Sequence, residues 1–159
     1  MIGLLNVATE EINVEIAMIT PEEHQAEGDT LVLIVAKPGR IRNSLEALLQ
    51  IMPRLKVAGV TCHSFSAMQM LAQYNPTLLL LDVDLSDNHA WVLLKQIQLK
   101  QLQTRCLLFV NSIEQQHAAK SAGANAALLK GFEAVELFTT IEKLVPQVKT
   151  IQVSETCAG

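Results

Sequence analysis

The chain has 159 residues, of which half are apolar and 18% are charged. This length suits one well-packed domain and is short for two. The net charge of -4 and the lack of a basic patch argue against nucleic-acid binding, which needs clustered Lys and Arg. No apolar run is long enough to span a membrane, and Glu10, Glu11 and Glu15 stand where a secretory signal would need lysines and an apolar block, so we expect no such signal. The three cysteines have no metal-binding spacing and suit a reducing compartment, so we expect a cytoplasmic protein.

Residues 1–29 differ in character from the rest of the chain. Within them, residues 12–18 alternate apolar and polar side chains, which is typical of a half-buried strand. Residues 20–29 are polar and acidic and suit a linker. We therefore expect an N-terminal extension with an edge strand that pairs with a partner, and an arm without regular structure is the alternative.

Continuous apolar runs predict buried strands along the rest of the chain. The stretch T-L-L-L-L-D-V-D-L at residues 77–85 has four consecutive leucines, as in a strand covered on both faces of a parallel sheet. The other predicted strands are residues 30–36, 57–61, 106–110 and 126–129.

Apolar residues at helical spacing follow each of these strands. Pro53 ends the first predicted helix, and Ser64 is the expected N-cap of the second. In the third helix we expect Val92, Leu93 and Ile97 to face the sheet, with Leu94 as a further candidate. The last helix covers about residues 132–145, and residues 146–159 form a C-terminal tail for which we expect no regular structure.

Five strands alternating with five helices predict an α/β fold. We expect a doubly wound (βα)5 three-layer sandwich with a flavodoxin-like parallel sheet in the order 2-1-3-4-5. This order brings the carboxyl ends of the first, third and fifth strands together around one crevice. Asp82 and Asp84 end the third strand there, and a buried carboxylate needs a partner or a metal.

Two motifs carry a resemblance to a known family. P-T-L-L-L-L-D-V-D-L at residues 76–85 is similar to the family pattern P-D-L-V-L-L-D-x-x-M/L, and A-G-A-N-A-A-L-L-K at residues 122–130 is similar to A-G-A-D-G-Y-L-L-K. Over residues 30–145 the chain resembles the receiver domain of two-component response regulators, the CheY-like superfamily, and most of all receivers of the nitrate-response type.

The resemblance places Asp82 at the phosphoacceptor position and Lys130 at the position of the lysine that pairs with the phosphoryl group. In such receivers a carboxylate attacks a phosphohistidine, and Mg²⁺ neutralises the developing charge. The metal is held by two acidic residues after the first strand, and Ala36 and Lys37 occupy those positions here. We therefore expect no Mg²⁺ and no other cofactor, and we predict that Lys37 and Lys130 both reach Asp82.

The positions that switch on activation also depart from the family pattern. Val110, or Leu108 if the next helix is placed differently, replaces the hydroxyl residue, and Ala127 replaces the aromatic one. Candidate crevice contacts that remain are Asp84, Asn111 and Ser112. Together these departures indicate an atypical receiver, or pseudo-receiver.

We therefore expect a stand-alone receiver-like domain in phosphorelay signalling that is not an enzyme and acts by phosphorylation-independent protein contact. The expected partner is a sensor histidine kinase or another regulator, and the mean hydropathy of +0.28 favours a homodimer. One alternative is a phosphorylatable single-domain regulator that accepts phosphate on Asp82. A second alternative is a flavodoxin-like domain that binds a small ligand in the crevice.

Overall fold

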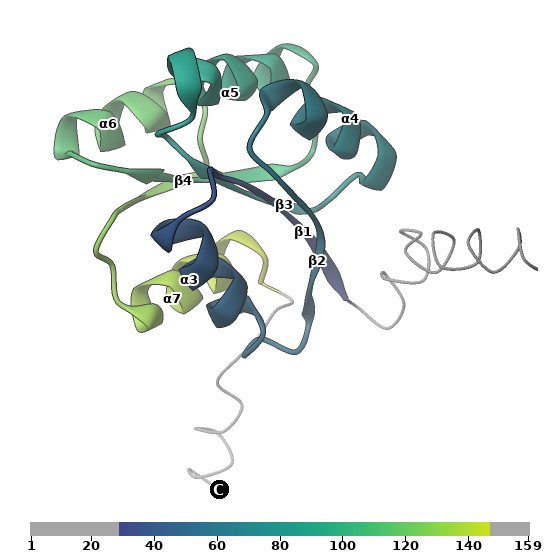
Figure 1. Cartoon of the computed structure of the whole chain (residues 1–159), viewed down its shortest axis with the longest axis vertical. Coiled ribbons are helices and arrows are strands. Elements are labelled where there is room, and N and C mark those ends of the chain that lie inside the picture. The colour runs from purple at the N-terminus through teal and green to yellow at the C-terminus, as the bar shows by residue number, and fades with distance from the viewer. Residues whose placement is uncertain (1–28, 147–159) are drawn as a thin grey trace, which may run out of the picture.

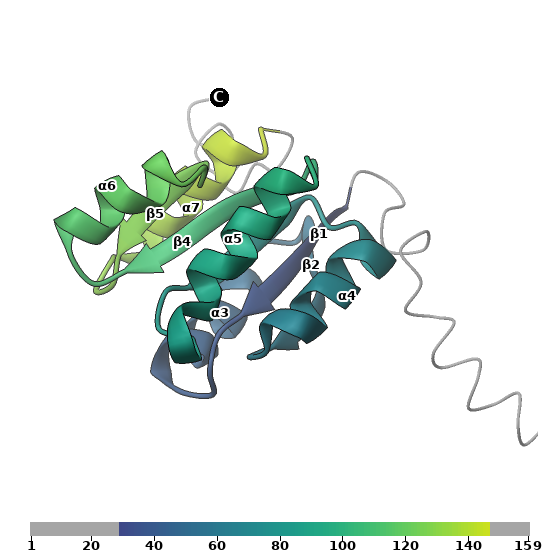
Figure 2. The ribbon, with the colours of Figure 1, turned by 90° about the horizontal axis from the view of Figure 1, so that it is seen from above.

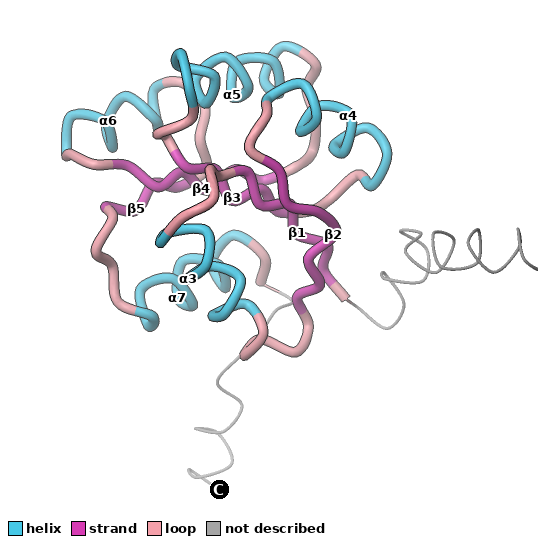
Figure 3. The backbone as a smooth tube through the Cα atoms, viewed as in Figure 1, coloured by secondary structure: helices cyan, strands magenta, loops and turns pink. Residues whose placement is uncertain are grey.

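The computed structural model describes residues 29–146. The expected N-terminal edge strand and the C-terminal tail lie outside these residues, except for Pro146. Figures 1 and 3 show a sheet sandwiched between two layers of helices. The layered arrangement follows from the sequence, because strands apolar on both faces must be covered on both faces.

All five strands of the sheet run parallel, in the order β2-β1-β3-β4-β5. The predicted fold and strand order are confirmed. The central strands β1 and β3 are buried along their whole length, and β2 and β5 form the two edges. The strand bounds are β1 Thr30–Val35, β2 Leu55–Thr61, β3 Leu78–Asp82, β4 Arg105–Val110 and β5 Ala126–Leu129.

Helices cover the two faces unequally. One face carries α4, α5 and α6, and the other carries α3 and α7 (Figure 1). The bounds are α3 Arg40–Leu49, α4 Ser64–Tyr74, α5 His89–Leu99, α6 Ile113–Ser121 and α7 Ala134–Leu144, with a short 3-10 turn, η2, at Ser86–Asn88.

Side chains that alternate along each strand divide the core in two. Odd-numbered residues of β1 and β3, such as Leu33 and Leu79, pack under α4, α5 and α6. Even-numbered residues of the same strands, such as Ile34 and Leu80, pack under α3 and α7. This alternation later decides which side chains meet at the carboxyl edge of the sheet.

The expectation that Val92 faces the sheet is wrong, because its side chain is 50% exposed. The inward face of α5 is formed instead by Ala90, Leu93, Leu94 and Ile97. Those residues are spaced by three, four and seven positions, which fills the apolar stripe of a helix. Val92 therefore lies on the outer side of α5.

Candidate functional site

The site forms where β3 ends. The side chain of Asp82, the last residue of β3, is 4% exposed, and that of Asp84 is 50% exposed. The backbone N–H of Asp84 donates a hydrogen bond to Oδ1 of Asp82 over 3.0 Å. This local bond is the kind by which an Asp side chain stabilises a turn two residues on, and it fixes the orientation of the buried carboxylate.

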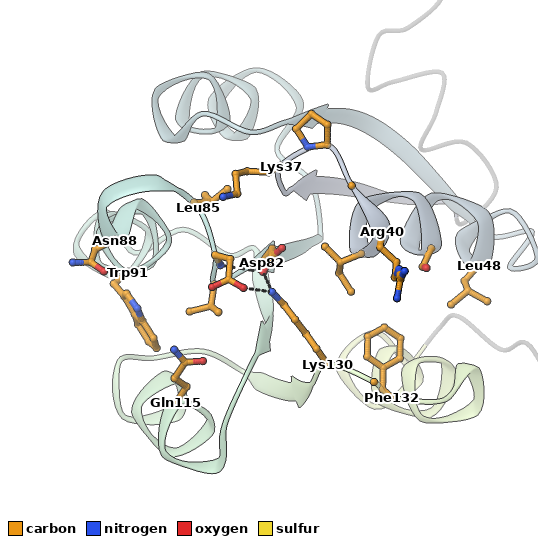
Figure 4. A pocket seen from close by; sticks show the side chains of 17 residues that line it. Lys37, Arg40, Leu48, Asp82, Leu85, Asn88, Trp91, Gln115, Lys130 and Phe132 are labelled. Atoms are coloured by element: carbon orange, nitrogen blue, oxygen red, sulfur yellow. Dashed lines mark hydrogen bonds and ion pairs between the residues drawn. The ribbon is translucent and has the colours of Figure 1, made fainter.

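One ammonium bridges both carboxylates. Nζ of Lys130 lies 2.5 Å from Oδ1 of Asp82 and 2.6 Å from Oδ2 of Asp84. The backbone positions it, because the N–H of Lys130 donates to the carbonyl of Val110 over 2.8 Å and so extends the β4–β5 ladder by one bond. Figure 4 shows the Lys130 side chain reaching from the end of β5 to the tip of β3. The charge of buried Asp82 is thus compensated within the domain.

An amide completes the cluster. Nδ2 of Asn111 donates to Oδ1 and to Oδ2 of Asp84, each over 3.0 Å. The backbone N–H of Asn111 in turn donates to Oε1 of Gln115, 2.7 Å away and four residues later at the start of α6. Asp84 is therefore held by two side chains from two different strand ends.

The pKa values of two groups respond to this arrangement. The pKa of Asp84 is lowered from its ordinary value of 3.8, chiefly by the hydrogen bond from Lys130, which together with Asn111 outweighs the effect of desolvation. For Lys130, desolvation acts to lower the pKa, but the hydrogen bonds and charges of Asp82 and Asp84 outweigh it and raise the pKa above 10.5. At neutral pH the bridge is therefore ionic.

The prediction that Lys37 reaches Asp82 is wrong. Lys37 is exposed, and among the described residues the ion-pair partner of Asp82 is Lys130. In Figure 4 the Lys37 side chain runs toward Leu85. Strand alternation gives the reason, because position 37 continues the odd-numbered side of β1, under α4 and α5, whereas Asp82 continues the even-numbered side of β3. Lys37 acts on the site only at long range, where its charge helps lower the pKa of Asp84.

The side of the sheet that holds the even-numbered residues of β3 also holds Ala36, which follows β1, and Lys130, which follows β5. Ala36 belongs to the core under α3 and α7, and Lys130 continues the series of Ala126 and Leu128, which pack against that core. Asn111 likewise continues the series of β4 residues that ends in Phe109. Asp82, Lys130 and Asn111 thus converge because their strands present them on one side of the sheet.

The two switch positions hold buried apolar side chains, Val110 and Ala127. The carbonyl of Ala127 accepts a hydrogen bond from Nε2 of Gln116 over 2.8 Å. Ser112 is not part of the cluster, because its hydroxyl accepts the N–H of Gln115 over 3.1 Å and caps α6. Of the candidate crevice contacts, the structure brings Asp84 and Asn111 together and leaves Ser112 outside.

The donor set does not fit a Mg²⁺ ion, which requires oxygen ligands in near-octahedral geometry. Ala36 offers only its carbonyl oxygen, and Nη1 of Arg42 already donates to that oxygen over 3.1 Å. Both carboxylates contact an ammonium. Within residues 29–146 no three His, Cys, Asp or Glu side chains are grouped closely enough to hold a metal.

A cleft of about 890 Å³ opens over the cluster. Its walls include Arg40, Trp91 and Phe132 besides Asp82 and Lys130 (Figure 4). Sequence reasoning missed Gln115, Arg40 and Phe132 as parts of the site. The four-residue spacing of Asn111 and Gln115 was a signal for the first, whereas no motif marks the other two.

Comparison with known proteins identifies the family. Residues 32–142 match the response regulator receiver domain family. The chain belongs to that family. The receiver is 28% identical over 116 residues to the Fimbriae Z protein of Salmonella typhimurium strain LT2, covering 72% of this chain and 55% of that protein. It therefore spans about half the length of this curated relative.

Solved structures share the receiver fold. A LuxR-family DNA-binding response regulator from Staphylococcus aureus superposes with a TM-score of 0.65 at 21% identity, covering 72% of this chain and 98% of that chain. A LuxR-family two-component response regulator from Aurantimonas sp. SI85-9A1 gives a TM-score of 0.68 at 17% identity, covering 82% and 99%. The described part of the receiver has no helix that is both long and apolar enough to cross a bilayer.

Proposed function

We propose that this receiver transmits its signal by protein contact in one fixed conformation, without Mg²⁺-dependent phosphorylation of Asp82. The observation that carries the proposal is the Lys130 ammonium, which bridges Asp82 and Asp84 in a chain whose acidic-pair positions hold Ala36 and Lys37. In this proposal the Lys130 ammonium, which is part of the chain, takes the place of a Mg²⁺ ion that would bind and dissociate.

Charge compensation supports this reading. A phosphoryl group carries nearly two negative charges at neutral pH. On Asp82 it would stand beside the carboxylate of Asp84, and both would share the single charge of Lys130. With Ala36 and Lys37 at the acidic-pair positions, those two positions offer no carboxylate to recruit a divalent cation that would make up the difference.

The Asp82 carboxylate is also constrained as a nucleophile. Its Oδ1 contacts Lys130 and accepts the N–H of Asp84. Hydrogen bonds and ion pairs to the charged form stabilise the carboxylate and so reduce its tendency to attack. The second oxygen would have to approach the phosphorus from a residue that is almost fully buried.

The proposed contact surface is the α6–β5–α7 face. It exposes Ile113, Leu129 and Val135, whose exposed fractions are 57%, 37% and 55%. The expected polar contacts on this face are Lys120, Glu133, Glu136 and Glu142. The partner would be a sensor kinase, another regulator or, in a homodimer, a second copy of the receiver.

Intact-mass measurement after incubation with acetyl phosphate and Mg²⁺ tests the proposal. We expect no gain of a phosphoryl group under conditions that fully modify an ordinary receiver run in parallel. Asp82→Asn is the matched control, since any adduct that persists in it is not on Asp82. An adduct that forms in the native chain and is lost in Asp82→Asn would overturn the proposal.

A phosphorylatable receiver is the second candidate, and the retained contact between Asp82 and Lys130 favours it. The mass experiment distinguishes the two directly. The cleft beside Arg40, Trp91 and Phe132 is the observation that favours a small-ligand domain instead. A thermal shift with nucleotides that Arg40→Ala abolishes would support that third reading.

A further inference from the structure

A groove separate from the Asp82 cleft runs between α4 and α5. Its volume is about 560 Å³, and it is lined by Phe65 and Met68 of α4, Val92 of α5, and Leu102 and Lys100 beyond α5. Phe65 is 73% exposed and Val92 is 50% exposed. Figure 2 shows the two helices side by side on the outer face of the sheet. Large apolar side chains at a hollow on an outer face are typical of a docking site.

The charged side chains around this groove are basic. Residues 55–81 and 88–113 contain no Asp or Glu, and their charged side chains are Lys56, Lys95, Lys100 and Arg105. The opposite helix layer differs, since α3 and α7 carry both acidic and basic side chains. An occupant that complements the groove should therefore combine apolar and acidic side chains.

One segment of the same chain has that chemistry. Residues 1–29 hold seven of the 16 acidic residues, and all 12 Lys and Arg residues come after them. Residues 2–19 intersperse leucine, isoleucine, valine and methionine with Glu10, Glu11 and Glu15. The charge of this segment is thus opposite to that of the groove, and its apolar content matches the exposed Phe65 and Val92.

The chain is also long enough to connect the two. The N–H of Thr77 donates to the carbonyl of Leu31, and the hydroxyl of Thr104 donates to the carbonyl of Pro76. The start of β1 therefore lies at the same edge of the sheet as Leu102, at one end of the groove. Ten extended residues reach about 33 Å, and an 11-residue helix such as α4 is only about 16 Å long.

We propose that the acidic N-terminal segment, residues 1–28, docks in the α4–α5 groove of its own chain. Its apolar side chains cover Phe65 and Val92, and its glutamates lie near Lys95 and Lys100. This role is independent of the chemistry at Asp82.

Limited proteolysis of the full chain with a glutamate-specific protease tests the proposal. In the native protein we expect cleavage after Glu10, Glu11 and Glu15 to be slower than in Val92→Ser or Lys100→Glu, with about a tenfold increase in each variant from lost apolar burial or reversed charge. The matched control is Ile51→Ser, just beyond α3, which removes an exposed apolar side chain next to the other helix layer. It should cleave at the native rate.

Equal cleavage rates in the native chain and in all three variants would overturn the proposal. Protection that decreases when the protein is diluted would also contradict it, because the occupant would then be the segment of a second copy. Hydrogen exchange provides an independent readout. The N–H groups of α4 and α5 should exchange faster in a full-length chain with Glu10, Glu11 and Glu15 changed to Lys, and unchanged exchange there would count against the groove.

Discussion

Lys130 forms an ion pair with Asp82 across an intervening strand, since β4 lies between the strands that carry them. The two residues are 48 positions apart in the sequence, and both sit on the α3–α7 side of the sheet. A carboxylate that is almost fully buried is thus neutralised by a side chain from the edge of the sheet. This ion pair balances the charge of the Asp82 carboxylate, and the hydrogen bond from the N–H of Asp84 fixes its orientation.

Removal of Lys130 should destabilise the fold. Lys130→Met leaves Asp82 buried without its cation, which costs about 3 kcal/mol of unfolding free energy. Asp82→Asn should cost less, and the double variant should recover part of the loss, as in a coupled pair. Urea unfolding of the four proteins measures this coupling. Strict additivity of the two single losses would show that the pair is not coupled.

Replacing Lys37 should change the stability of the fold very little by comparison. Because its side chain is exposed and forms no ion pair with Asp82, Lys37→Ala should change the unfolding free energy by less than about 0.5 kcal/mol. The same urea experiment, with Lys130→Met as the reference, gives the answer. A loss as large as that of Lys130→Met would mean that Lys37 does reach the carboxylate.

Stability should depend on pH at both ends of the range. The pKa of Asp84 is lowered in the folded state, so its contribution is present above the unfolded value of 3.8 and is lost as pH falls through the folded pKa. The pKa of Lys130 is raised, so its contribution is present below 10.5 and is lost as pH rises through the folded pKa. Between roughly pH 5 and pH 10 these two groups should add no slope.

Urea unfolding midpoints between pH 3 and pH 11 measure the loss of stability at acid pH and the loss at alkaline pH. Asp84→Asn should reduce the loss of stability at acid pH and keep most of the loss at alkaline pH, because Asp82 still pairs with Lys130. Lys130→Gln should reduce both losses, because the hydrogen bond from Lys130 is also the main cause of the lowered pKa of Asp84. If the pH dependence of stability is unchanged in both variants, it must come from other groups.

Restoring an acidic pair should restore metal binding. Ala36 lies on the same side of the sheet as Asp82, and Lys37 lines the same cleft, so Ala36→Asp together with Lys37→Asp supplies the missing carboxylates. Trp91, the single tryptophan, lines the cleft and provides a fluorescence signal. We expect the double variant to respond to millimolar Mg²⁺ and the native chain to show no response. A variant that ignores Mg²⁺ would indicate that Lys130 alone excludes the ion.

Cys106 should report on global unfolding. Burial raises the pKa of its thiol to about 12, so almost no thiolate forms at neutral pH. In a Cys157→Ser background, a thiol reagent should modify the partly exposed Cys62 quickly and Cys106 only at the rate of opening. Fast modification of both thiols in the native state would contradict the packing of β4.

The sequence predicted the fold well because the strands are uninterrupted apolar runs and the βα rhythm leaves few topologies. Family motifs also identified the two ends of the main ion pair, Asp82 and Lys130. The error at Lys37 came from treating all residues at the end of β1 as equivalent. Counting even and odd positions along β1 and β3 would have placed Lys37 and Asp82 in opposite side-chain series, so that both line the cleft without forming an ion pair. The side-chain role of Asp84 was harder to foresee, because it depends on an amide from the next strand, Asn111.

The Lys130 bridge also has a mechanical consequence. β5 is an edge strand of only four residues, the kind of element expected to fray first. The ion pair between Lys130 and Asp82 connects the end of this strand to the end of β3, two strands away in the sheet. A partner that binds β5 therefore contacts a strand that is held to the centre of the sheet. Separating β5 from the sheet would require breaking the ion pair between Lys130 and Asp82.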